Sequence, residues 1–259
     1  MASEISPKAE ISPKAKIGDN CKIFPFVYIE DDVVIGDNCI IFPFVSICDG
    51  SRIGNNNKIH QGSVIAALPQ DFNFRGAKSY VEIGDNNVIR ENVVINRGTN
   101  KDGVTKIGNH NFLLEGTHIS HDTVVGDNCV FGYGTKIAGD CEIGNGVIFS
   151  SSVIENAKTR VGRGAMIQAG TTFSKDVPPF IICTKRSEYG GVNYTMGRMN
   201  GIDEKVLKHI ANAYRLVFHG QTSLFDAVKQ IEEQVPDSAE IRHIIEFMKS
   251  TQQGIITKL

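Results

Sequence analysis

An apolar residue recurs at every sixth position over long stretches of this chain. Isoleucine holds this position without a break from Ile5 to Ile65, and the same phase returns from Ile83 to Ile95 and from Ile107 to Phe173. Six residues are not a helical period, but they are a multiple of two, so each apolar residue can point to the same face of successive short strands. The spacing predicts a stack of short strands with one buried face.

Corner residues follow the apolar position, as in the run from Ile35 to Asn38, which reads IGDN. Glycine and asparagine tolerate the positive φ of tight corners. Each hexad therefore predicts a strand and a corner, and three hexads make one triangular coil. The sequence predicts a mainly β fold, a parallel β-helix over residues 1–180.

The cysteines fit the same repeat. Four of the six stand four residues after the apolar position, where a second small residue is expected to point inward; they are Cys21, Cys39, Cys129 and Cys141. No C-x-x-C pair and no histidine at zinc-site spacing accompanies them. We expect small core residues in a reducing compartment.

Glu155 stands at an inward position of the repeat. A buried carboxylate without a partner is costly. We therefore expect the strand to shift at this point, so that Ile154 turns inward in place of Glu155.

Two stretches lose the apolar position without losing the phase, near residues 70–80 and 97–105, and their polar residues and glycines predict loops. Pro178-Pro179 ends the repeat, and we expect residues 181–201 to form a bridging segment. From residue 202 to 259 the period becomes helical. Asp203 and Glu204 suit the first turn of one helix, Ser223 can cap the next, and Ser238 starts a third. These helices are too small to bury much surface alone and are expected to pack on the β-helix.

Composition excludes several classes of protein. Hydrophobic residues make up 41% and charged residues 22% of the chain, as in globular proteins. A formal net charge of -2 gives no general affinity for nucleic acid. No apolar run approaches the ~18 residues of a membrane span, and the N-terminus has no signal-peptide pattern. A cytoplasmic location without stable membrane insertion is expected.

The run from His118 to Asp122, HISHD, resembles the His-x-x-His-Asp signature of the UDP-N-acetylglucosamine acyltransferases of lipid A biosynthesis, a family of hexapeptide-repeat acyltransferases. Further matching runs extend over nearly the whole chain: PQD at 69–71, IREN at 89–92, INRGT at 95–99, AG at 138–139, DVPP at 176–179, GVN at 191–193 and NAYR at 212–215. The resemblance implies a left-handed β-helix and a homotrimer with active sites between subunits.

The resemblance also implies a reaction: transfer of a fatty acyl group, expected to be 3-hydroxylated, from acyl carrier protein to the 3-hydroxyl of UDP-N-acetylglucosamine, the first step of lipid A synthesis. His121 would be the general base and Asp122 would orient it. The backbone N–H of Gly139, one coil of eighteen residues later, would stabilise the oxyanion. Substrate-binding positions implied by the resemblance are Gln70, Asp71, Arg75, His118, Asp140, Asn156, Ala169, Arg186, Asn193 and Arg198.

No metal or redox cofactor is expected, because His118 and His121 alone offer only two ligands. Several positions depart from the family pattern. Asp140 replaces a histidine, Asn156 and Ala157 replace a His-Gln pair, and Asn73 replaces a lysine. Two alternatives therefore stay open: a transferase for a related acceptor such as a 3-amino sugar nucleotide, or a non-catalytic paralogue kept for binding or assembly.

The stretch from Ala157 to Arg198 contains only two acidic residues. It contains seven basic residues: Lys158, Arg160, Arg163, Lys175, Lys185, Arg186 and Arg198. We hypothesise that this stretch meets the acidic carrier protein or the nucleotide phosphates. A solvated basic surface without a partner is the alternative.

Overall fold

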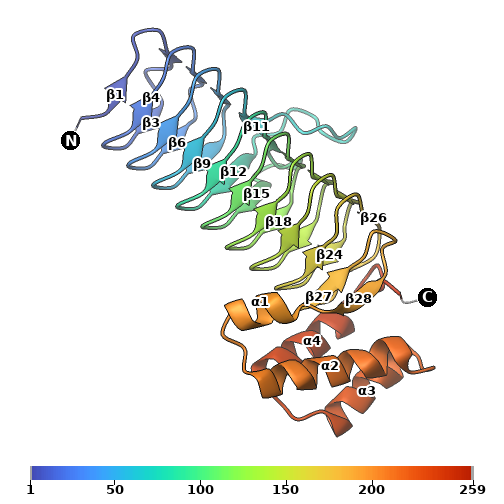
Figure 1. The fold of residues 1–259 in the computed structure, drawn as a ribbon. Coiled ribbons are helices and arrows are strands. Elements are labelled where there is room, and N and C mark those ends of the chain that lie inside the picture. The colour runs from blue at the N-terminus through green and yellow to red at the C-terminus, as the bar shows by residue number, and fades with distance from the viewer. Residues whose placement is uncertain (1, 258–259) are drawn as a thin grey trace.

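The structure is a computed structural model that describes residues 2–257. Consecutive strands fall in three different sheets, so the chain winds around a three-sided prism (Figure 1). All strand pairs are parallel except the last, β27 with β28. The parallel β-helix that the six-residue period predicts is confirmed.

The three faces of the prism are named sheets A, B and C. Sheet A contains β1 (Glu4–Ile5), β4 (Lys22–Ile23), β7 (Ile40–Ile41), β10 (Lys58–Ile59), β13 (Val88–Ile89), β16 (Phe112–Leu113), β19 (Val130–Phe131), β22 (Ile148–Phe149), β25 (Met166–Ile167), β27 (Ile181–Cys183) and β28 (Tyr189–Val192). Sheet B contains β2 (Glu10–Ile11), β5 (Tyr28–Ile29), β8 (Ser46–Ile47), β11 (Val64–Ala67), β14 (Val94–Asn96), β17 (His118–Ile119), β20 (Lys136–Ile137), β23 (Ile154–Glu155) and β26 (Thr172–Phe173). Sheet C contains β3 (Lys16–Ile17), β6 (Val34–Ile35), β9 (Ser51–Ile53), β12 (Tyr80–Ile83), β15 (Val104–Ile107), β18 (Val124–Val125), β21 (Glu142–Ile143) and β24 (Arg160–Val161).

The repeat positions form the core. Ile23, Ile41 and Ile59 are aligned on neighbouring strands of sheet A, and each is at most 2% exposed. Where phenylalanine takes the position, the rings of Phe131 and Phe149 stack with centroids 5.0 Å apart. Identical side chains one strand spacing apart thus fill the prism as continuous ladders.

Inside the corner between sheets C and A, buried asparagines replace the small apolar residue. The Asn57 side-chain oxygen accepts from the Asn87 backbone N–H (2.9 Å), and the Asn87 oxygen accepts from the Asn111 N–H (2.8 Å). Five of the six cysteines are also buried and all are free thiols. Burial raises the pKa of Cys39 and Cys129 to about 11, so these thiols stay protonated and unreactive.

Glu155 points into the core, and the expected strand shift is wrong. Its side chain is fully buried, whereas Ile154 is 45% exposed. The register is regular, since Ile137 and Phe173 flank Glu155 on the neighbouring strands. A shift would have moved every neighbouring ladder, and one protonated carboxyl is the less disruptive solution: burial raises the pKa of Glu155 well above 4.5.

Wild-type stability should therefore depend on pH in a way that Glu155→Gln removes. A raised folded-state pKa means that the stabilising proton is fully bound below 4.5, the ordinary value, and is lost as pH rises through the folded value. The free energy of unfolding of wild type should fall relative to that of Glu155→Gln as pH rises above 4.5. Urea unfolding of both proteins over a pH series measures the difference. Parallel curves would show that Glu155 is ionised in the fold.

Two loops leave the prism at the predicted places, with slightly different bounds. The first occupies residues 68–79, between β11 and β12, and projects from the side of the prism (Figure 1). The second occupies residues 97–103, between β14 and β15. Both therefore lie next to sheet B, on successive coils.

Residues 181–201, expected as a bridge, contain more structure than that. Strand β27 extends sheet A by pairing with β25, and β28 folds back on β27. Helix α1 (Tyr194–Met199) follows, and then α2 (Glu204–His219), α3 (Leu224–Gln234) and α4 (Ala239–Lys249). The last three begin where the sequence predicts helices, and their N-caps are Asp203, Ser223 and Ser238, of which Ser223 was expected as a cap.

The helices pack on the C-terminal end of the prism. Tyr214 of α2 is fully buried and its hydroxyl donates to the Pro179 carbonyl (2.5 Å). Asp176, 1% exposed, accepts from Arg160 and from the Thr251 hydroxyl (2.7 Å). The chain after α4 then returns to the prism, where Ile255 pairs with Asp176. None of the described helices has the length and hydropathy needed to cross a membrane.

Candidate active site

The histidine of the candidate site lies on the edge where sheet B turns into sheet C, here called the B/C edge. Strand β17 places Ile119 in the core, and the turn after it carries His121 and Asp122 outward. Asp122 adopts the left-handed conformation (φ 58°) that aspartate tolerates in a tight corner. The His121 side chain is 12% exposed, so it is largely enclosed.

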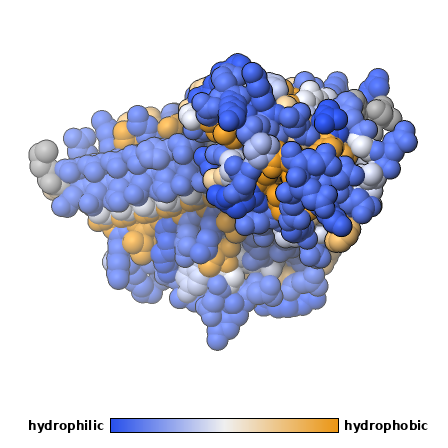
Figure 2. Space-filling model, turned by 90° about the horizontal axis from the view of Figure 1, so that it is seen from below, coloured by the Kyte–Doolittle hydropathy of each residue, from blue (hydrophilic) through white to orange (hydrophobic). Residues whose placement is uncertain are grey.

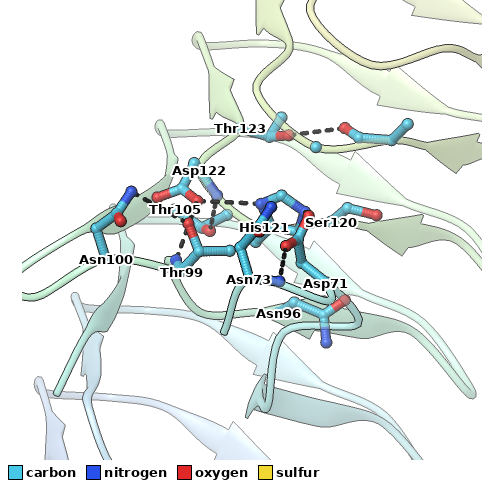
Figure 3. Close-up of polar contacts among 12 residues, drawn as sticks. Asp71, Asn73, Asn96, Thr99, Asn100, Thr105, Ser120, His121, Asp122 and Thr123 are labelled. Carbon is cyan, nitrogen blue, oxygen red and sulfur yellow. Dashed lines mark hydrogen bonds and ion pairs between the residues drawn. The ribbon is translucent and has the colours of Figure 1, made fainter. Parts of the chain in front are cut away.

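Asp122 holds His121 from one side (Figure 3). The Asp122 Oδ2 atom lies 3.0 Å from His121 Nδ1 and accepts from the Thr99 N–H (3.0 Å) and the Thr99 hydroxyl (2.7 Å). The Asp122 backbone N–H donates to the Thr105 hydroxyl (2.8 Å). Because a carboxylate can only accept, His121 carries its proton on Nδ1, and Nε2 keeps a free lone pair.

Asp71, on the loop over residues 68–79, faces the other nitrogen of His121. Its Oδ2 atom lies 3.6 Å from Nε2, beyond hydrogen-bond distance. The long loop thus folds back onto the B/C edge and brings a carboxylate beside the imidazole. A hydroxyl group that reaches Nε2 next to Asp71 can give its proton to this nitrogen.

Gly139 lies against the His121 ring from the next coil. A Cβ atom at Gly139 would come within 2.3 Å of His121 Cε1 and 2.5 Å of Nε2, so no other residue fits beside the ring. The neighbouring peptide groups are bonded: the Ala138 N–H donates to Glu155, and the Ala138 carbonyl accepts from the Thr123 hydroxyl (3.1 Å; Figure 3). The Gly139 N–H has no partner within residues 2–257 and is available as a donor.

His118 is half-buried beside the site and is neutral at pH 7. Burial lowers its pKa below 6.5, and the charge of Lys136, its neighbour on β20, lowers it further. Its Nε2 atom lies 3.0 Å from the Ser120 hydroxyl. His118 therefore offers a neutral polar edge next to His121.

Asp140 brings a third carboxylate to His121, where the family pattern has a histidine. One donor atom each from His121, Asp122 and Asp140 lie within 4.8 Å of one another, a spacing that a metal ion could use and that the sequence did not suggest. The Asp122 Oδ2 atom already accepts from the Thr99 N–H and hydroxyl, so a metal bound to that atom would compete with these two hydrogen bonds. Asp122 and Asp140 thus place carboxylate oxygens around the imidazole.

The other predicted binding positions are divided among the three edges of the prism. On the B/C edge, Gln70 and Asn156 are exposed close to the set described, while Arg75 turns back to the Phe72 carbonyl of its own loop. Ala169 and Arg186 lie on the edge between sheets A and B. Asn193 caps α1 and donates to the Gly164 carbonyl on the edge between sheets C and A.

Arg198, on α1, is paired with Glu204 and lies over the Tyr194 ring. One chain therefore gathers His121, Asp122, Gly139, Asp71 and Asp140, but does not bring Ala169, Arg186, Asn193 or Arg198 to them. Sequence reasoning missed Thr99 and Thr123. The INRGT run contains Thr99, yet nothing in it indicates that this threonine binds Asp122.

Comparison with known proteins gives a consistent result. Hexapeptide-repeat transferase models match residues 14–41, 34–67 and 105–139, and a model described as UDP-N-acetylglucosamine O-acyltransferase, domain 2, matches residues 176–256. The acyl-[acyl-carrier-protein]–UDP-N-acetylglucosamine O-acyltransferase of Sulfurihydrogenibium sp. is 45% identical, over 97% of this chain and 94% of its own length. The enzyme of the same name from Xylella fastidiosa is 37% identical over 78% of each chain.

Solved structures agree in fold over the full length. The UDP-N-acetylglucosamine acyltransferase of Bacteroides fragilis superposes with a TM-score of 0.95 at 47% identity, covering 97% of this chain and 99% of the other. That of Francisella novicida gives a TM-score of 0.95 at 32% identity, covering 98% and 94%. The fold is the left-handed parallel β-helix expected from the resemblance. The chain belongs to the family of acyl-[acyl-carrier-protein]–UDP-N-acetylglucosamine O-acyltransferases.

Proposed function

We propose that the chain transfers a 3-hydroxy fatty acyl group from acyl carrier protein to the 3-hydroxyl of UDP-N-acetylglucosamine, the first step of lipid A synthesis, with His121 as general base. One observation carries the proposal: His121 is held by the Asp122 carboxylate, packs against Gly139 of the next coil, and has Asp71 beside its Nε2 atom. A general base, its orienting carboxylate and an oxyanion donor are the three parts that acyl transfer needs.

The reaction follows from this geometry. The sugar hydroxyl reaches Nε2 next to Asp71, loses its proton to the imidazole and attacks the thioester carbonyl carbon. The Gly139 N–H donates to the oxyanion of the tetrahedral intermediate. The C–S bond then breaks, and the imidazolium returns the proton to the leaving thiolate. An ester and a free carrier thiol result, while Asp122 stays ionised and keeps the imidazole oriented.

An apolar stripe on the outer face of sheet A supports a fatty acyl donor. Its members are aligned from strand to strand and half-buried; they are Val88, Phe112, Val130, Ile148, Met166 and Ile182. The stripe reaches β27, close to Ala169 and Arg186, which we propose to lie at the far end of the acyl chain. Seen from below the view of Figure 1, the surface is mainly hydrophilic, with patches of hydrophobic residues (Figure 2).

We propose that the complete site forms between subunits of a homotrimer. In a three-sided prism the B/C edge is opposite sheet A, so His121 cannot act on an acyl chain held by its own stripe. A partner copy that places sheet A, Ala169 and Arg186 against His121 would complete the site. The same assembly would bring Asn193 and Arg198 of one subunit toward the sugar nucleotide.

The basic residues near the C-terminal end divide into two groups. Arg160 is bound to Asp176 and lies on the Phe247 ring, with centroid distance 4.4 Å, so it holds the fold together. Four others are exposed and make no side-chain ion pair or hydrogen bond within the described residues; they are Lys158, Arg163, Lys185 and Arg186. We propose that this second group receives the acidic carrier protein.

Replacing Lys158 and Arg163 together with serine should raise KM for the acyl carrier protein by about 3- to 10-fold at low salt, because rim charges mainly accelerate encounter. The effect should shrink at high ionic strength, and kcat should hardly change. Lys16→Ser, on an exposed lysine at the other end of sheet C, is the matched control. An unchanged KM at low salt would leave these residues as a solvated surface.

The acyl-transfer assay tests the function itself. The purified protein receives UDP-N-acetylglucosamine and a pool of 3-hydroxyacyl carrier proteins of mixed length, and the mass of the product identifies the acyl chain. A product that carries an ester on the sugar supports the proposal. Product formed only with 3-amino sugar nucleotides would assign the changed acceptor, and nucleotide binding without any product would assign a non-catalytic paralogue. We further propose a cytoplasmic location, which six free thiols favour.

A further inference from the structure

Glu155 breaks the apolar ladder of sheet B directly below the oxyanion turn. Its neighbours in the ladder are Ile137, in the coil that carries Gly139, and Phe173. The Glu155 Oε1 atom lies 2.9 Å from the Thr159 hydroxyl, whereas Oε2 has no partner among the described residues. A buried carboxyl with one unsatisfied oxygen costs stability. Isoleucine, which holds so many equivalent positions, would avoid this cost.

The polar contacts of Glu155 lead to the turn that carries Gly139. Thr159 lies 2.7 Å from the Asn156 carbonyl, and the Cys141 thiol lies 3.3 Å from the same carbonyl. A hydroxyl has one proton to donate. With Glu155 in its neutral form, the acid donates to Thr159, and Thr159 donates to Asn156. Carboxyl, hydroxyl and carbonyl then form one directed chain along the inner side of the corner at 156–158.

This corner supports the oxyanion turn through two backbone hydrogen bonds. The Ala138 N–H donates to the Glu155 carbonyl (3.0 Å), and the Lys158 N–H donates to the Gly139 carbonyl (3.1 Å). The two peptide groups on either side of the one that presents the Gly139 N–H are therefore bonded to residues 155–158, and a change in the conformation of this corner should turn the peptide between them. A departure from a local rule that costs stability is expected where function requires it.

We propose that Glu155 is a positioning residue of the transferase: from inside the prism it fixes, through Thr159, the corner whose hydrogen bonds hold the turn that presents the Gly139 N–H to the reacting carbonyl. The inference rests on the proposed role of Gly139. It also explains why an acid persists where the repeat calls for isoleucine. Glu155 touches neither substrate, so its effect is on orientation and not on binding.

Glu155→Ile and Thr159→Val test the proposal, with kcat, both KM values and the thermal midpoint measured for each. Glu155→Ile should keep or raise the thermal midpoint and leave both KM values within about 2-fold of wild type. It should lower kcat by about 10-fold, which is a fraction of the loss expected for removing an oxyanion donor. Glu155→Gln, which keeps a donor and an acceptor, should retain kcat within about 3-fold. A purely structural role would move the midpoint and not separate kcat from KM.

Thr135→Val is the matched control for Thr159→Val, because Thr135 is a buried threonine that bonds a carbonyl (Ser150, 3.3 Å) on the edge between sheets A and B. Only Thr159→Val should lower kcat. A folded Glu155→Ile with wild-type kcat overturns the proposal. If that variant does not fold, equal kcat for the two threonine variants overturns it. Full activity in His121→Ala would instead refute the proposed site, so that variant is assayed first.

Discussion

His121→Ala should lower the rate of acyl transfer by roughly 10²-fold or more, because positioned general bases contribute 10²- to 10⁴-fold. The loss should appear in kcat, since the imidazole acts on the proton that moves in the transition state. Asp122 and Thr99 would remain in place without the ring, so the fold and the binding of the sugar nucleotide should persist. Steady-state kinetics and nucleotide binding by calorimetry measure the two quantities.

His110→Asn is a suitable control for this experiment. His110 lies on an exposed corner in the left-handed conformation (φ 56°), which asparagine adopts readily, and it is remote from the B/C edge. It should keep wild-type rates. Comparable turnover in His121→Ala and wild type would mean that another group removes the proton.

Gly139→Ala should abolish most activity, by about 10²-fold or more, in a protein that folds normally. The added methyl group would meet the His121 ring at 2.3 Å, so the imidazole must move away from its place beside Gly139. The corner itself accepts a side chain, since the same position one coil later is Ala157. Losing the alignment of base and oxyanion donor costs as much as losing either group. Kinetics and a thermal unfolding curve separate the two effects.

The double variant His121→Ala/Gly139→Ala makes this prediction sharper. If the clash with the ring is the whole effect, adding Gly139→Ala to His121→Ala should lower the residual rate by no more than about 2-fold and should leave the thermal midpoint unchanged. The reason is that the effects of neighbouring sites that act as a unit are not additive. A large further loss of stability would show that the corner backbone, and not the imidazole, requires glycine. Full activity of Gly139→Ala would show that His121 does not act as the general base.

Much of the architecture could be predicted because the repeat depends on local rules. The six-residue period identified the inward residues, and the N-cap of α3 followed from a single residue, Ser223. The spacing of one coil also predicts that Gly139 lies beside His121, as it does in the structure. Each of these features needs only the phase of the repeat or a side chain that bonds its own backbone.

Partners that are distant in the sequence could not be predicted. Nothing in the sequence indicates that Thr99 bonds Asp122, or that Arg160 is held by Asp176 and is therefore withdrawn from the basic surface. The expected strand shift at Glu155 is wrong because a buried carboxyl group can hold its proton, and burial raises the pKa of Glu155 well above 4.5. A period tells which face a residue takes, whereas the choice among polar partners depends on three-dimensional contacts.

The two ends of the prism differ in how well they are covered, and they should therefore differ in how readily they unfold. In a coiled stack each turn is held mainly by its neighbours, so unfolding proceeds from an end. At the first coil Ile5 is 48% exposed, whereas the last coils are covered by β28, the helices and the returning segment at Ile255. Fraying should therefore begin at the N-terminal coils and reach the coil of Gly139 late. The machinery proposed for catalysis thus occupies the part of the stack that local fluctuations disturb least.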